Sequence, residues 1–99
     1  MCTYATERRT VTGSGKGPQE WLGVTTATVY FDHPAHAMAD HTLNIDFADP
    51  GRGPSARVAL ELTAESAIAL CEAIVKTLGS VPRELSGIDP GRLAPLAST

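Results

Sequence analysis

All three histidines of the chain, His33, His36 and His41, lie between residues 33 and 41. Neutral imidazole is a common protein ligand of transition metals, and it suits zinc as well as copper, iron, nickel and manganese. The cluster predicts a divalent metal site with the three histidines as ligands and zinc as the first expectation. Cys2 is the candidate fourth ligand, since a thiolate binds zinc, on the condition that the start of the chain lies near the histidines.

Two carboxylates, Asp32 and Asp40, flank the histidines. Either one could orient an imidazole by accepting its other ring N–H, without binding the metal itself. Three protein ligands leave one coordination position open, the arrangement that catalytic zinc uses to activate water or polarise a carbonyl. On this hypothesis the catalytic proton-transfer group is one of these carboxylates, Asp32 or Asp40, in a small metal-dependent hydrolase, lyase or isomerase that acts on a small molecule.

Two other interpretations of the histidines stay open. The spacing matches no zinc signature such as His-Glu-x-x-His. The histidines could instead form a metal-free cluster that contacts a ligand, or they could be polar residues at the rim of a hairpin. The alternative function is therefore a metal-free dimeric module that binds a small molecule or a protein. Trp21 and Tyr30 could line a pocket, although aromatic residues in strands more often serve the core.

Hydrophobic periodicity indicates which elements position these residues. Residues 21–31 are rich in β-branched and aromatic side chains, while 41–47 and 57–62 alternate between apolar and polar, so all three predict strands. A weaker extended pattern covers residues 2–12, and the glycine-rich stretch 13–18 predicts a turn.

The alternation of the two central strands places His33 and His41 on the same, apolar face. If residues 34–40 connect these strands as a hairpin, the two histidines close it from opposite sides. Directly opposite residues have Cβ atoms about 5 Å apart, a separation at which two imidazoles can reach one metal ion.

An amphipathic helix follows the last strand. Thr63 is the expected N-cap and Gly79 the expected end, and apolar residues recur at three- and four-residue spacing between them. We expect an α+β fold, an antiparallel meander of three to four strands with the helix packed on one face. Residues 1–79 form this single β-β-β-β-α domain, and residues 80–99 form an irregular tail that contains prolines.

The composition limits the partners and the compartment. Eleven acidic against eight basic residues give a net charge of −3, which argues against nucleic acid because that affinity comes from Lys and Arg neutralising phosphates. No apolar run approaches the roughly 20 residues of a membrane span, and no signal peptide is recognisable. We expect a cytoplasmic protein. One helix covers only part of a four-stranded sheet, so we also expect a homodimer.

Four segments carry a family resemblance: Met1-Cys2-Thr3-Tyr4, the turn Gly13-Ser14-Gly15-Lys16-Gly17, residues 25–47 and Val58–Leu78. The third contains Asp32-His33-Pro34 and His41-Thr42-Leu43-Asn44-Ile45-Asp46-Phe47. Together they resemble a family of short actinobacterial proteins known only as a domain of unknown function. The resemblance implies a free-standing fold, and it implies no activity.

Overall fold

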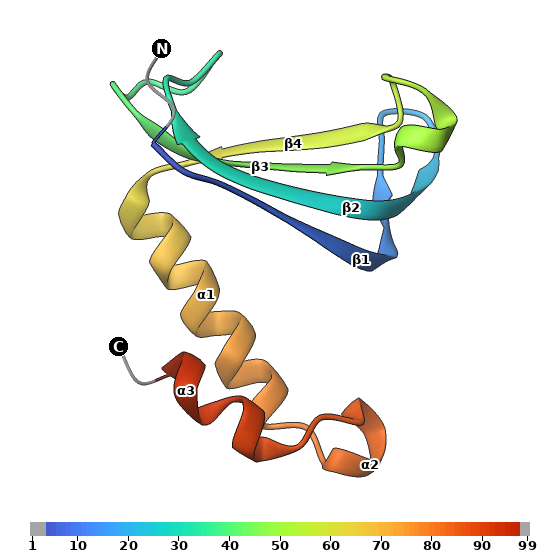
Figure 1. The fold of residues 1–99 in the computed structure, drawn as a ribbon, viewed down its shortest axis with the longest axis vertical. Helices are drawn as coiled ribbons and strands as arrows, with labels where there is room; N and C mark the ends of the chain where they lie inside the picture. The colour runs from blue at the N-terminus through green and yellow to red at the C-terminus, as the bar shows by residue number, and fades with distance from the viewer. Residues whose placement is uncertain (1–3, 98–99) are drawn as a thin grey trace. The chain divides into compact units, whose positions relative to one another are not determined.

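A computed structural model describes residues 4–97 of the chain. Its four strands are β1 (Thr6–Lys16), β2 (Trp21–Asp32), β3 (Thr42–Ala48) and β4 (Arg57–Leu62). They form one antiparallel sheet in the order β1-β2-β3-β4 (Figure 1). The predicted meander is confirmed, and the edges of the sheet are the first and the last strand.

The helical part follows the sheet directly. Helix α1 (Ala64–Gly79) begins one residue after the expected cap Thr63, and the tail contains the short helices α2 (Arg83–Ser86) and α3 (Ala94–Ala97). The chain divides into two compact units between Ala64 and Glu65, a sheet unit and a helical unit. The α+β class is confirmed, while packing of the helix on one sheet face stays a prediction. No helix among residues 4–97 is long and apolar enough to cross a membrane.

The strand register separates an apolar from a polar face. Phe31 pairs with Leu43, which pairs with Leu62, and paired residues point to the same side of a sheet. On the opposite face, Tyr30 pairs with Asn44, which pairs with Glu61. The apolar face also carries Ala27, Val29, Ile45, Phe47, Val58 and Leu60.

The β1–β2 hairpin differs from the prediction. Residues 13–16, expected to be a turn, continue β1, and the turn follows with the Gly17 N–H donating to the Glu20 carbonyl at 2.8 Å. A Cβ added to Gly15 would stand 3.2 Å from Val58 Cγ2. The glycine therefore lets the hairpin approach β4 closely, and a bulge between Thr10 and Gly13 shifts the register on the way. A glycine-rich sequence alone does not show whether its glycines form a turn or allow close packing within a strand.

The tightly packed part of the sheet unit is small. Its buried apolar side chains are Leu22, Val24 and Ala56, and none of the apolar-face residues of β2, β3 or β4 named above reaches that degree of burial. Two polar residues are more deeply buried: Thr42 is fully inaccessible, and its hydroxyl donates to Asn44 Oδ1 at 2.6 Å. This bond satisfies polar atoms that would be costly to bury alone.

Candidate functional site

The hairpin between β2 and β3 brings His33 and His41 together, as predicted. The last register pair is Asp32 with Thr42, and beyond it the two imidazole rings stack with centroids 4.4 Å apart at 30°. Phe31 continues the stack on His41, at 5.7 Å and 9°. The prediction that these two histidines meet across the hairpin is therefore confirmed.

Asp40 and Asp32 contact His33 in ways that the sequence did not indicate. The Nδ1 atom of His33 lies 2.8 Å from the backbone carbonyl oxygen of Asp40. A carbonyl only accepts, so Nδ1 carries the proton and the lone pair lies on Nε2. The Asp32 carboxylate accepts the backbone N–H of His33 at 2.7 Å. Asp40 thus orients the imidazole through its main chain, and Asp32 contacts the main chain of His33.

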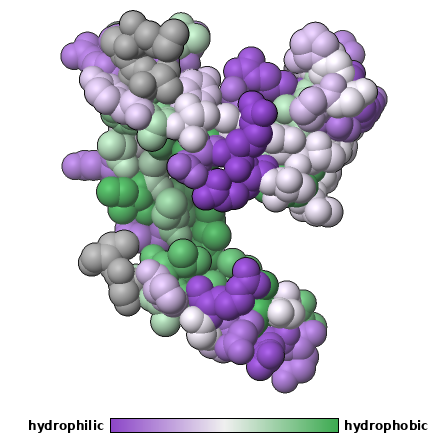
Figure 2. Space-filling view, viewed as in Figure 1, coloured by the Kyte–Doolittle hydropathy of each residue, from purple (hydrophilic) through white to green (hydrophobic). Residues whose placement is uncertain are grey.

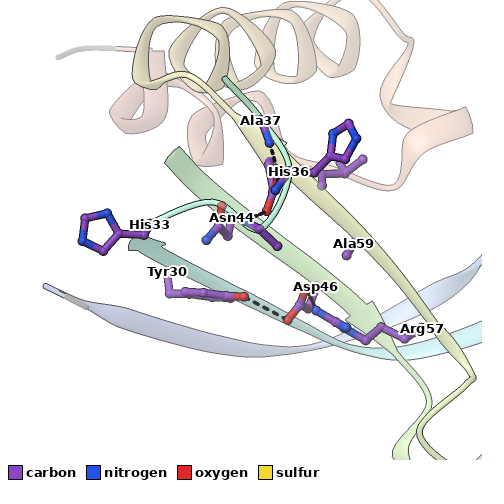
Figure 3. Close-up of a pocket in the computed structure, with 11 residues that line it drawn as sticks. Tyr30, His33, His36, Ala37, Asn44, Asp46, Arg57 and Ala59 are labelled. Atoms are coloured by element: carbon purple, nitrogen blue, oxygen red, sulfur yellow. Dashed lines mark hydrogen bonds and ion pairs between the residues drawn. The ribbon is translucent and has the colours of Figure 1, made fainter. Parts of the chain in front are cut away.

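His36 does not join the other two histidines. It belongs to the connecting loop, and Figure 3 shows its ring and that of His33 pointing in different directions on either side of the pocket described below. Residues 4–97 contain no group of three His, Cys, Asp or Glu side chains placed to hold one metal ion. Cys2 lies outside the described residues, and the metal site stays a prediction.

The residue that organises the loop is Glu61 on β4. Its carboxylate accepts three consecutive backbone N–H groups, those of Ala35, of His36 at 3.0 Å and of Ala37 at 2.8 Å. The hydrogen bonds from Ala35 and Ala37 hold the pKa of Glu61 below its ordinary value of 4.5, against a smaller opposing effect of desolvation. The sequence does not distinguish Glu61 from an ordinary polar position of an alternating strand, so this role could not be predicted from it.

A pocket of about 570 Å³, open to solvent, lies between the loop and the polar face of the sheet (Figure 3). One row across three strands forms part of its lining, with Asn44 between Tyr30 and Glu61. Ala59, paired with Asp46, adds only a methyl group to the next row. The lining residues are Tyr30, His33, Ala35, His36, Ala37, Asn44, Asp46, Arg57, Ala59, Leu60 and Glu61.

A second polar group lies beside Ala59. Arg57 donates to Asp46 Oδ1 at 2.9 Å, and the Tyr30 hydroxyl donates to Asp46 Oδ2 at 3.4 Å. Burial, followed by the negative charge of Asp46, raises the pKa of the Tyr30 phenol, so the phenol stays protonated. The hydrogen bond to Asp46 raises the pKa of Arg57. Tyr30 therefore lines the pocket, as the sequence allowed, while Trp21 is exposed and lies outside it.

These groups can bind a polar molecule without a covalent step. The pocket offers a carboxylate held by loop amides, and a carboxamide, a phenol and an ion pair held by neighbours on the sheet. Ligand sites are typically concave, preformed and equipped with a few fixed polar groups.

Comparison with known proteins identifies the family of the chain. A model described as "Family of unknown function (DUF6295)" matches residues 1–87. No curated protein and no solved structure matches the chain.

Proposed function

The chain belongs to the family of unknown function DUF6295, and we propose that it is a dimeric cytoplasmic protein that binds a small polar molecule in the pocket on its polar sheet face. The observation that carries this proposal is the set of hydrogen bonds between the Glu61 carboxylate and the loop. Three hydrogen bonds fix residues 35–37 over the sheet. A pocket whose wall is already fixed loses less conformational entropy when a ligand binds.

The small side chain of Ala59, in the lining of the pocket, supports the same function. It stands on β4 between Arg57 and Glu61 and pairs with Asp46. A larger side chain at this position would project from the polar face into the space that Figure 3 shows among the labelled residues. The small residue leaves the hollow open.

Replacing Ala59 with Leu tests the proposal. We would titrate isotope-labelled protein with mixtures of small amines, acids and alcohols and follow the backbone amide signals. We expect saturable shifts at Asn44, Ala59 and the loop around His36 in the original protein, and none in Ala59→Leu at an unchanged melting temperature.

Ala69→Leu is the matched control, because Ala69 is an exposed alanine on α1. It should leave the shifts intact. Shifts that persist in Ala59→Leu, or that cluster away from the pocket, would contradict the proposal.

A second candidate function is binding of a transition metal, zinc first, and a separate observation favours it. Two imidazoles on one tetrahedral zinc ion place their ring centres about 5 Å apart, close to the 4.4 Å between His33 and His41. Metal-bound histidines usually donate their other ring N–H to a carboxylate or carbonyl, as His33 does to Asp40. The metal-dependent hydrolase, lyase or isomerase would use this centre, with Asp32 or Asp40 as its proton-transfer group.

A further inference from the structure

We infer that the ligand of the polar-face pocket carries a positive charge, in the form of a primary amine or a guanidinium group attached to a flat or apolar body. The inference rests on the proposed function, since it names the chemical class that the same pocket takes. It follows from how the charges that line the pocket are already paired.

The one cationic side chain with a permanent charge in the lining is already neutralised. The Arg57 guanidinium forms an ion pair with Asp46 at 2.9 Å. The Tyr30 hydroxyl donates to the other oxygen of the same carboxylate. An anionic ligand would meet a guanidinium whose charge Asp46 already balances, and the Glu61 carboxylate in the same lining would repel it.

The carboxylate of Glu61 keeps its charge, and among residues 4–97 it forms no ion pair with a lysine or arginine side chain. A positive charge on His36 is the smallest of the effects that lower its pKa. The three hydrogen-bond donors of Glu61 are neutral backbone amides. A carboxylate offers about four lone-pair sites, so one more donor can be accommodated. An ammonium or guanidinium group supplies both that donor and the balancing charge.

The surroundings of Tyr30 indicate the same sign of potential. Burial is the largest cause of its raised pKa. The negative charge of Asp46 comes next and outweighs the opposing positive charge of Arg57, and Asp32 adds a smaller effect of the same sign as Asp46. Arg8 lies on the same face of β1, where it pairs with Thr28, but it does not line the pocket. The lining therefore has an excess of negative charge at a pH where imidazoles are neutral.

The register sets the size of the ligand. Tyr30 and Glu61 lie two strands apart in one row with Asn44 between them, a backbone separation of about 10 Å. A cation at Glu61 can thus extend a flat body over Asn44 and Ala59 towards the ring of Tyr30. Aromatic rings pack favourably against such a body.

Three probes of nearly the same shape test the charge: benzylamine, benzyl alcohol and benzoate. Each would be titrated into isotope-labelled protein at about pH 8, where imidazole groups as a class are neutral. We expect benzylamine to shift the amides of His36, Ala37 and Ala59 with at least about tenfold higher affinity than the other two, since a charged hydrogen bond is lost with each of them. Added salt should weaken benzylamine binding.

Glu61→Gln should weaken benzylamine binding by about tenfold, and Glu65→Gln on α1 should leave it unchanged. Because Glu61→Gln also loosens the loop, the comparison of the three probes on the original protein decides the matter. Equal or tighter binding of benzyl alcohol or benzoate at the pocket would overturn the charge assignment and leave the binding function in place. Absence of pocket shifts with all three probes would overturn both.

Discussion

The carboxylate of Glu61 accepts the backbone N–H of Ala37 at 2.8 Å, across 24 positions of the chain. An edge strand thereby holds the loop that connects the two central strands. The same loop carries His36, so one side chain on β4 fixes the segment that forms the wall of the pocket.

Replacing Glu61 with Gln is predicted to loosen this loop in a pH-dependent way. Because the folded-state pKa of Glu61 lies below 4.5, its stabilising contribution is present above that value and is lost as pH falls through the lowered pKa. Melting temperatures of the original protein and Glu61→Gln should differ near neutral pH and converge in acid. Faster amide hydrogen exchange at residues 35–37 should accompany the difference. A gap in melting temperature that is the same at every pH would contradict this account, and Glu72→Gln, at an exposed position in the middle of α1, is the control.

A pair of glycines in the β1–β2 hairpin offers a matched test of packing. Gly15→Ala places a methyl group 3.2 Å from Val58 Cγ2, and a β-branched neighbour has little rotamer freedom with which to yield. We expect a loss of about 1–3 kcal/mol in the free energy of unfolding, measured in urea. Gly23→Ala meets nothing within 4 Å and should be neutral or stabilising by up to about 1 kcal/mol. Equal effects of the two substitutions would show that the hairpin does not approach β4.

The histidine pair predicts the metal content. Protein made without a histidine tag should contain close to one transition metal ion per chain by elemental analysis. His33→Ala combined with His41→Ala should abolish it, while His36→Ala should retain it because that ring points elsewhere. Asp40→Asn should also retain it, since the backbone carbonyl contacts His33. Low metal content that does not rise on addition of zinc, copper, iron or manganese would refute the metal site.

The unburied apolar side chains predict a homodimer. Within the sheet unit Leu60 is 38% exposed, and within the helical unit Ile68 and Ile74 are 61% and 51% exposed. Figure 2 shows apolar surface running along α1. Burial of such side chains stabilises a small domain that has a limited core of its own. We expect a dimer by light scattering at micromolar concentration. A monomer whose residues beyond Val81 resist proteolysis would contradict it.

Much of the fold follows from short-range pattern. Period-two alternation correctly located the two central strands and their apolar face, and from that face it predicted the meeting of His33 and His41. The two Asp-Pro-Gly-Arg segments also depend on short-range contacts. Asp49 accepts from the Gly51 N–H and Asp89 from the Gly91 N–H, each at the start of a 3-10 turn. Neighbours in the chain supply both partners of these contacts, so the sequence alone determines them.

The pocket was decided by the tertiary structure. The hydrogen-bond partners of Glu61 are backbone amides. Nearly every residue has one, so residue types in the sequence do not reveal which amides it will contact. Asp40 contacts His33 through its carbonyl for the same reason. Gly15 serves close approach to Val58, and Ala59 leaves space between side chains of two strands. Each of these roles depends on which distant segment lies opposite, and that is set only when strand register and loop path are fixed together.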